Sequence, residues 1–312
     1  MAIQQITDTI LMIRPVNFRM NEQTVVNNFF QEDLDLKNTE INTRAQAEFD
    51  VFVEKLRAKG INVVVESDLT THDTPDSIFP NNWVSFHASG DIAIYPMFAE
   101  NRRVERREDI FDRLEEAGFG IRNIIDYTSA EEEDVFLEGT GSVLMDRVNE
   151  IAYCALSPRA DEELFIEFCE DFEYTPVVFN ASQTVDGERL AIYHTNVMMC
   201  LGETFCVICF DTIDDKKERK NLEKNLRASG KEIIAITEAQ MKQFAGNMLQ
   251  VKGADDKRYL IMSAAAHQSL TPKQIATVEK SSEILSSDLS TIEACGGGSA
   301  RCMMAEVFLP KK

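Results

Sequence analysis

Three residues that lie far apart in the sequence are of the types that thiol-dependent catalysis requires. Cys302 follows a glycine-rich stretch in "GGGSARC", His194 lies between the apolar runs "LAIY" and "VMMC", and Glu138 precedes the glycines of "LEGTG". A thiolate attacks an electrophilic carbon, an imidazole transfers protons, and a carboxylate orients the imidazole and stabilises its charge. Glycines also let the backbone approach a substrate closely. The three side chains are therefore candidates for a nucleophile, a general acid/base and its partner.

Each of the three residues also has a purely structural interpretation, and spacing alone leaves both open. His194 is compatible with a hydrogen-bonded core histidine, Glu138 with an acid in a surface turn, and Cys302 with a buried strand thiol. The chain contains 7 cysteines. Their number is odd and they form no matched pair of CxxC motifs, so no zinc site is indicated. Cys295 is interpreted as a structural thiol.

The acidic composition argues against several classes of function. The chain has 312 residues, a net charge of -21 and a pI near 4.6. Phosphate backbones and anionic membrane surfaces attract clusters of Lys and Arg, so neither is an expected partner. The first residues lack the pattern of a signal peptide, and no apolar run approaches the roughly 20 residues of a membrane span. We therefore expect a cytoplasmic protein.

The elements that must position the candidate residues recur along the chain. A pattern of strand, hairpin, helix and strand appears about five times, at a spacing of roughly 60 residues. Helices are predicted at 42–60, 101–118, 160–172, 214–230 and 271–282, the last with Thr271 as N-cap and Pro272 in its first turn. Hairpins are predicted at 83–97, 141–156, 197–210 and 247–266, and single strands at 9–15, 61–67, 121–127, 175–180, 231–237 and 302–310.

Four segments rich in reactive residue types immediately precede or open these strands and hairpins. They are 73–87, 136–146, 192–199 and the glycine-rich stretch 295–304. In a radial array of repeats, the strand ends and loops near the middle would bring the four segments together, and the helices would cover the outside. A plain α+β domain is the alternative that periodicity alone favours.

The motifs and their order resemble the pentein, or guanidine-modifying enzyme, superfamily, and most closely an amidinotransferase-related family named for citrulline utilisation. "GGGSARC" is similar to the glycine-rich nucleophile loop of that family, "LEGTGSVL" to its EGG motif, "HTN" to its H-x-D motif, and "DSIFPNNW" to a loop that carries an aspartate in relatives. The resemblance covers nearly the whole chain. It implies an α/β fold in one catalytic domain over residues 1–312, built as a five-bladed α/β propeller of ββαβ units around a central site.

The resemblance also implies roles for individual residues. Cys302 would be the nucleophile, His194 the general acid/base and Glu138 its partner. Arg159, in "ALSPRAD", would bind a substrate carboxylate, with a surface position at a helix start as the alternative. Arg14 is a weaker candidate for the same task, for which an ion pair at a strand end is the alternative. The substrate-binding candidates also include Asp76, to orient a substrate amine, and Phe79 in the same segment.

The chain departs from the family where deiminases hold a cationic guanidinium between two carboxylates. The matching positions carry Asn82, with its neighbour Asn81, and Asn196. An amide gives up the negative charge but supplies both a donor and an acceptor, which suits a neutral ureido group. This favours citrulline, cleaved to ornithine, carbon dioxide and ammonia through an S-carbamoyl intermediate. Some family members, however, hydrolyse guanidino substrates with asparagine nearby.

Several alternatives therefore stay open at this point. They are an arginine or guanidino deiminase or dihydrolase, an amidinotransferase with an amine as acceptor, and a non-catalytic binding module of the same fold. The expected ligand is a small amino acid, without a metal ion or an organic cofactor. A homodimer is among the assemblies considered.

Overall fold

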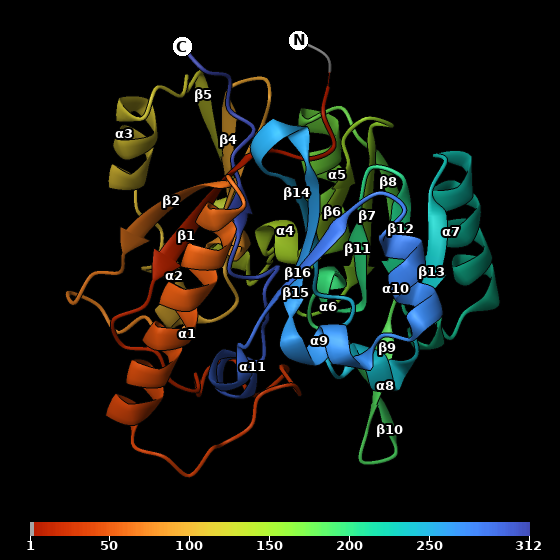
Figure 1. Ribbon diagram of the computed structural model, residues 1–312, viewed down its shortest axis with the longest axis horizontal. Helices are drawn as coiled ribbons and strands as arrows, with labels where there is room; N and C mark the ends of the chain where they lie inside the picture. Colours follow the sequence, from red (N-terminus) through yellow and green to blue (C-terminus); the bar gives the residue numbers. More distant parts are fainter. Residues whose placement is uncertain (1–2) are drawn as a thin grey trace.

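The computed structural model describes residues 3–312, which form a mixed α/β fold with several small sheets (Figure 1). The described residues form five three-stranded sheets, in each of which the middle strand has one antiparallel and one parallel neighbour. In four sheets the strands are consecutive: β3 (Val84–Phe86), β4 (Asp91–Ile94) and β5 (Asn123–Asp126); β6 (Val143–Asp146), β7 (Ile151–Leu156) and β8 (Thr175–Asn180); β11 (Met199–Leu201), β12 (Phe205–Ile208) and β13 (Glu232–Ala235); β14 (Leu249–Lys252), β15 (Arg258–Ser263) and β16 (Glu283–Ser287).

The fifth sheet joins the two ends of the chain. Its order is β17 (Ala305–Glu306), β1 (Thr9–Arg14) and β2 (Asn62–Ser67). β17 pairs antiparallel with β1, with Leu11 opposite Ala305, and β1 pairs parallel with β2. The C-terminal strand thus takes the place that the first strand of a hairpin has in the other sheets. This places the glycine-rich stretch 295–304 directly before the strand that completes the fifth sheet.

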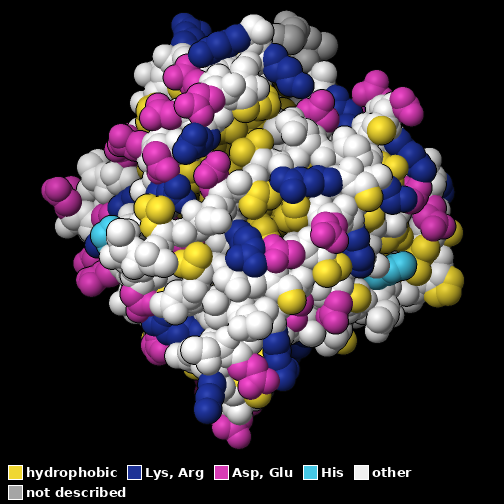
Figure 2. All heavy atoms as spheres, turned by 60° about the vertical axis from the view of Figure 1, so that its left-hand side comes forward, with side chains coloured by type: hydrophobic (Ala, Val, Ile, Leu, Met, Phe, Trp, Pro, Cys, Tyr) yellow, Lys and Arg dark blue, Asp and Glu magenta, His cyan; other side chains and the backbone are white. Residues whose placement is uncertain are grey.

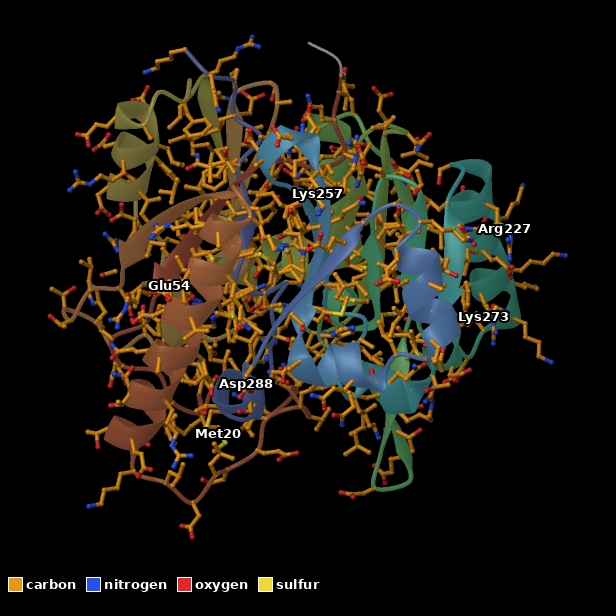
Figure 3. The ribbon with its side chains drawn as sticks, viewed as in Figure 1. Met20, Glu54, Arg227, Lys257, Lys273 and Asp288 are labelled. Carbon is orange, nitrogen blue, oxygen red and sulfur yellow. The ribbon has the colours of Figure 1, made fainter. Side chains whose placement is uncertain are left out.

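Helices connect the middle strand of each sheet to its parallel neighbour. They are α1 (Asn38–Ala58), α2 (Glu100–Arg103) with α3 (Asp109–Glu116), α5 (Glu162–Asp171), α7 (Lys216–Ala228), and α9 (Ala264–Ser269) with α10 (Pro272–Val278). Local sequence signals explain several of the helix starts: the Asp215 side chain accepts hydrogen bonds from the first turn of α7, and Thr271 forms a capping box ahead of Pro272 in α10, as predicted. Arg227 of α7 and Lys273 of α10 are exposed on outer helix faces (Figure 3).

The core has apolar clusters on both faces of the sheets. On β1, Ile10 and Met12 pack in one cluster with Phe52 of α1, whereas Leu11 and Ile13 belong to a second cluster. Side chains alternate between the two faces of a strand, so a strand buried on both faces consists of consecutive apolar residues. On the face shown in Figure 2, acidic and basic side chains are interspersed with apolar groups. Within residues 3–312, no helix is both long and apolar enough to cross a membrane.

Some predicted elements differ from the observed ones. The helix predicted over 101–118 is divided into α2 and α3, and at the division Arg102 and Glu105 are buried and pair with each other. The strand predicted over 302–310 is limited to β17, since residues 299–304 form turns in which Cys302 N–H donates to the carbonyl of Ser299. The prediction did not include the hairpin of β9 (Ser182–Val185) and β10 (Glu188–Ala191), the strand β16, or the helices α8 (Glu238–Met241) and α11 (Ser290–Gly296).

Candidate functional site

Short turns before the first strand of each sheet bring the predicted site residues together. The 3-10 turn Pro80–Asn82 precedes β3, α4 (Gly139–Ser142) precedes β6, α6 (Thr195–Met198) precedes β11, and residues 299–304 precede β17. α4 and α6 lie near the middle of the molecule (Figure 1). Gly139 has φ +43°, and a side chain there would collide with the backbone of Asn81, so glycine is required for the close approach of two turns.

Hydrogen bonds connect each turn to the next. Asn81 Nδ2 donates to Thr140 Oγ1 at 3.3 Å, and Asn196 Nδ2 lies 3.5 Å from the carbonyl oxygen of Thr140. Asn247, in the corresponding turn before β14, donates to the carbonyl of Asn196 at 3.1 Å and accepts from the N–H of Arg301 at 3.0 Å. The convergence expected from the sequence is therefore observed, and it includes a fifth turn that the prediction missed.

The Glu138 and His194 side chains form a buried pair. Nε2 of His194 lies 2.7 Å from Oε2 of Glu138, and the two residues are 1% and 0% exposed. Gly141 makes room for the imidazole, because a Cβ there would lie 2.8 Å from Nδ1 and Cε1 of His194. Burial lowers the pKa of His194 to about 4, although Glu138 opposes this shift, so the imidazole is neutral at pH 7.

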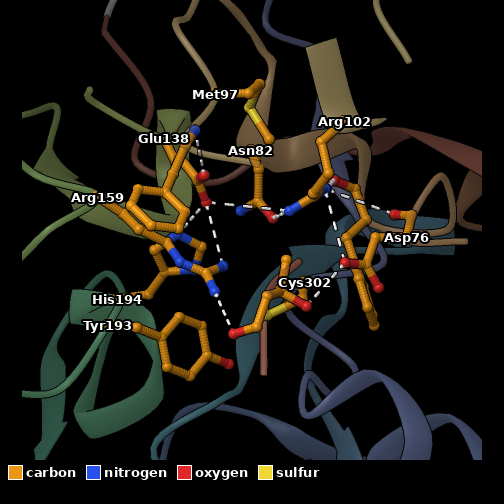
Figure 4. A network of polar contacts seen from close by, with 12 residues as sticks. Asp76, Asn82, Met97, Arg102, Glu138, Arg159, Tyr193, His194 and Cys302 are labelled. Atoms are coloured by element: carbon orange, nitrogen blue, oxygen red, sulfur yellow. Dashed lines mark hydrogen bonds and ion pairs between the residues drawn. The ribbon is translucent and has the colours of Figure 1, made fainter. Parts of the chain in front are cut away.

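Two arginines also surround Glu138. Nη1 of Arg159 lies 3.5 Å and Nη1 of Arg102 lies 3.9 Å from Oε2, while the N–H of Phe98 donates to Oε1 at 3.0 Å. Burial would raise the pKa of Glu138, but Arg159, His194 and Arg102 together lower it to about 2. Glu138 is therefore a carboxylate, and the neutral imidazole must donate its Nε2 proton to it. The Nδ1 nitrogen of His194 is left to exchange protons (Figure 4).

Cys302 is buried and contacts amide side chains. Its Sγ lies 3.2 Å from Nδ2 of Asn247 and 3.6 Å from Nδ2 of Asn196, and the residue is 3% exposed. Among the described residues, His194 is not a hydrogen-bond partner of this sulfur. The side-chain donors beside the sulfur are thus two amides. Burial raises the pKa of Cys302, while the Ser299 backbone, Asn247, Arg301 and Asn196 oppose this shift.

The glycine-rich stretch encloses an aromatic ring. A side chain at Gly296 or Gly298 would lie 2.7 or 3.0 Å from Cζ of Phe79, and one at Gly298 would also lie 3.3 Å from Cβ of Cys302. Phe79 therefore packs against the loop that carries the candidate nucleophile. Gly297 ends α11 in the left-handed region, at φ +60°.

Three predicted polar residues hold buried atoms that lack a hydrogen-bond partner within the described structure: Asn81 Oδ1, Asn82 Nδ2 and Asp76 Oδ1. Asn82 Oδ1 accepts from Nη1 of Arg102 at 2.8 Å, which fixes the orientation of its amide. Asp76 Oδ2 accepts from Asn21 Nδ2 at 2.8 Å. Burial raises the pKa of Asp76, with Arg102 and Asn21 opposing this shift. A buried polar atom without a partner is unfavourable, and these three atoms are available to form hydrogen bonds with a ligand.

A segment without helices or strands, residues 15–37, lies over this site. Asn21 contacts Asp76, and Asn27 Oδ1 accepts from Nε of Arg159 at 2.9 Å. Thr24 supplies its carbonyl to Nη2 of Arg159 at 3.1 Å. Arg159 is consequently a buried residue of the site and not the surface residue of the alternative interpretation.

The structure separates other candidates from the site. Arg14 forms an ion pair with Asp50 at 2.7 Å, as its alternative interpretation proposed. Cys295 is a buried free thiol. No group of three or more His, Cys, Asp or Glu in the described part of the chain could hold a metal ion. Sequence reasoning missed Arg102, Glu105, Asn247 and the contacts from the segment 15–37. Of these, only Asn247 carried a signal, its position directly before a predicted hairpin.

Comparison with known proteins gives a family and a fold. The model of the eukaryotic N,N-dimethylarginine dimethylhydrolase family matches residues 14–309. No curated protein matches the sequence. The structure is similar to apo ArgZ, an arginine dihydrolase from the ornithine–ammonia cycle in cyanobacteria, with a TM-score of 0.74, 17% identity and 97% of this chain covered.

Two further solved structures are similar. Unliganded AgrE has a TM-score of 0.73 at 18% identity over 97% of this chain. An adduct of a dimethylarginine dimethylaminohydrolase variant with S-methyl-L-thiocitrulline has a TM-score of 0.63 at 14% identity, over 96% of this chain and 99% of that one. The chain spans only 41% of the ArgZ chain and 40% of the AgrE chain. At these identities the structural matches show the fold alone.

Proposed function

The chain belongs to the N,N-dimethylarginine dimethylhydrolase family, within the pentein superfamily of guanidine-modifying enzymes, and we propose that it is a cysteine-dependent hydrolase of a ureido or guanidino amino acid. As a member it is an enzyme that acts on C–N bonds, which argues against a non-catalytic binding module. The buried Glu138–His194 pair, held in the same enclosed site as Cys302, is the observation that carries the proposal. The pair supplies a proton-exchanging imidazole, and Cys302 supplies the nucleophile.

The first half of the proposed reaction forms a covalent intermediate. Cys302 Sγ attacks the ureido or guanidino carbon, and the thiol proton passes to Nδ1 of His194. The bond between this carbon and the leaving nitrogen then breaks, and His194 delivers the proton to that nitrogen. Glu138 stabilises the transient imidazolium. With citrulline, ornithine leaves and an S-carbamoyl group remains on Cys302.

The second half releases the acyl group. A water attacks the S-carbamoyl carbon, its proton passes to His194, the C–S bond breaks and the thiol is restored. The product carbamate decomposes to carbon dioxide and ammonia. Donors directed at the tetrahedral centre stabilise the charge that develops on it, and Asn82 and Asn196 are the proposed donors.

Asn82 supports a ureido substrate such as citrulline. Its carbonyl is occupied by Arg102, and its Nδ2 is a buried donor without a partner. Such a donor needs an acceptor from the ligand, which a ureido oxygen provides and a protonated guanidinium does not. The charges of Arg102 and Arg159 are already balanced by nearby acids.

Asp76 supports the second candidate, a guanidino amino acid. Its Oδ1 is a buried carboxylate oxygen without a hydrogen-bond partner, and a guanidinium would supply both an N–H and a positive charge to it. Under this alternative, Asn82 Nδ2 would bind the α-carboxylate of the substrate. Arg159 or Arg102 would also have to exchange a present partner for that carboxylate.

The five-bladed propeller is the architecture that we propose for these sheets. Five sheets of the same topology, and turns linked in series from Asn81 to Arg301, support it. The ring of Phe79 against Gly298 connects the last turn to the first.

Product analysis tests the function. Purified protein is incubated with citrulline, arginine, Nω,Nω-dimethylarginine and succinylarginine, and ammonia and the organic products are measured. We expect ammonia and ornithine from citrulline, and no turnover by Cys302→Ser. Absence of any product from the whole panel would overturn the hydrolase assignment, and products that appear only with an added amine would indicate an amidinotransferase.

Charge variants test the substrate preference. Asn82→Asp keeps the shape of the side chain but supplies a carboxylate where the present group donates. We expect the ratio of kcat/KM for citrulline to that for arginine to fall at least tenfold. Asn225→Asp, on the outer helix α7, is the matched control. An unchanged ratio in Asn82→Asp would contradict the ureido argument.

A further inference from the structure

We propose that Asn247 is a catalytic residue that stabilises the Cys302 thiolate, with Asn196 as a weaker second donor. Asn247 belongs to the turn before β14, on a different sheet from Cys302. Its Nδ2 lies 3.2 Å from Sγ, whereas the corresponding distance from Asn196 is 3.6 Å. This inference rests on the proposed role of Cys302 as nucleophile.

The hydrogen bonds of Asn247 determine which of its atoms faces the sulfur. Oδ1 accepts the backbone N–H of Arg301 at 3.0 Å, a group that can only donate. Nδ2 donates to the carbonyl of Asn196 at 3.1 Å, a group that can only accept. Both contacts exclude the flipped amide, so the atom next to Sγ is an N–H donor.

Asn247 itself is held rigidly by its surroundings. The residue is completely buried, and a side chain at the preceding Gly246 would lie 2.2 Å from the carbonyl oxygen of Val197. The turn before β14 therefore packs directly against α6, which carries Asn196. A donor fixed before the reaction stabilises a developing charge without having to reorient.

A donor at this position favours the ionised form of Cys302 over the neutral thiol. Burial disfavours the thiolate, and His194 is hydrogen-bonded to Glu138 and not to the sulfur. The charged and titratable groups around Cys302 are Arg301, the next residue towards the N-terminus, and the Tyr193 phenol, whose hydroxyl donates to the carbonyl of Gly297. Among the side-chain donors in residues 3–312, the amide of Asn247 therefore lies closest to the sulfur.

Two substitutions separate this electrostatic role from a structural one. Asn247→Leu removes the donor together with the contacts to Arg301 and Asn196. Asn247→Asp retains an acceptor for the N–H of Arg301 but places a carboxylate oxygen against the sulfur. If Asn247 acts as a donor, the thiol pKa rises in the folded leucine variant and rises further in the aspartate variant, whose carboxylate adds a like charge beside the sulfur. If Asn247 only holds the turn, the folded leucine variant keeps the thiol pKa of the unmodified protein.

The thiol is titrated on the folded protein without substrate, from the pH dependence of Cys302 alkylation by iodoacetamide, followed by peptide mass spectrometry. We expect the apparent thiol pKa to rise by about 1 to 2 in Asn247→Leu, or at least a tenfold slower alkylation at pH 7, and to rise further in Asn247→Asp. Cys302→Ser gives the background. Circular dichroism checks the fold, and if the leucine variant does not fold, Asn247→Ser replaces it.

Asn28→Leu is the matched control. Asn28 Nδ2 donates to the carbonyl of Gly296 at 3.2 Å, so this amide also holds the glycine-rich stretch, but it does not contact the sulfur. In the Asn28→Leu variant, the thiol pKa of Cys302 should remain that of the unmodified protein. An unchanged thiol pKa in the folded leucine variant, or a value for the aspartate variant between those of the unmodified protein and the leucine variant, overturns the inference. The titration needs no substrate, so this result is independent of whether the proposed turnover is found.

Discussion

The Glu138 carboxylate accepts a 2.7 Å hydrogen bond from Nε2 of His194, across 56 positions of sequence. Because Arg159 and Arg102 keep Glu138 ionised, the imidazole has to place its proton on Nε2. The relationship therefore decides the tautomer of His194 and directs Nδ1 to the chemistry. It also leaves the thiol dependent on other groups, which accounts for the amides around Cys302.

Replacing Glu138 by glutamine removes the charge but preserves the size of the side chain. We expect kcat to fall about 10²- to 10⁴-fold, since the imidazolium loses its partner and the glutamine amide can hold the wrong tautomer. Two buried arginines also lose a counter-charge, so the free energy of unfolding, measured with urea, should fall by about 3 kcal/mol or more. A variant with undiminished kcat would contradict the role of Glu138.

Gly141→Ala tests the space that the imidazole needs. The new methyl group would lie 2.5 Å from Asn82 Nδ2 and 2.8 Å from Nδ1 of His194, so the ring must move. We expect kcat to fall at least 10²-fold, because displacement by about 1 Å is enough to disturb proton transfer. Gly120→Ala is the control, as its nearest neighbour would be 3.5 Å away and its activity should be retained. Equal activities in the two variants would show that the close approach at Gly141 is unimportant.

Acidification should destabilise the protein partly through His194. Its folded pKa of about 4 lies below the usual 6.5, so the unfolded chain binds more protons between these values. Stability is therefore lost as the pH falls from about 6.5 towards 4, by up to about 1.4 kcal/mol per pH unit. Urea unfolding at pH 7.5, 6 and 5 measures this slope. In His194→Gln, the slope of the unfolding free energy against pH should be smaller between pH 6 and 5, by the equivalent of about one proton. Parallel curves of unfolding free energy for the two proteins would refute the lowered pKa of His194.

Glu293 should make the unfolding free energy depend on pH in the opposite direction. Burial raises its pKa to about 7, so the folded protein binds more protons than the unfolded chain between about 4.5 and 7. The resulting stability is lost as the pH rises through 7. Glu293→Gln retains an acceptor for the Ser299 hydroxyl, which now donates to the carboxylate at 2.6 Å. We expect its stability relative to the unmodified protein to increase by about 1 kcal/mol between pH 6 and 8, measured by urea unfolding. No change over this interval would mean that Glu293 is not held as a buried acid.

The sequence alone determined several of the elements and the residue types of the site. The apolar period of α1 and β1, the caps of α10, and the hairpins that become β3–β4, β6–β7, β11–β12 and β14–β15 are local features, and local patterns encode them. Cys302, His194, Glu138 and Asn82 could be proposed because each belongs to a short motif directly before a strand. Asn247 has the same position, but its motif has no reactive group to attract notice.

Only the tertiary structure decided which atoms of these residues meet. Arg102 lies in a run of charges that is typical of an exposed helix. It is buried instead, and it donates to Asn82, which lies 20 residues away in the 3-10 turn. His194 is hydrogen-bonded to Glu138 and not to Cys302, whose sulfur lies beside amides 55 and 106 residues away. The sequence pattern specifies burial and periodicity along the chain, whereas protonation states and hydrogen-bond partners depend on distances between separate sheets. Those distances exist only once the five turns have converged.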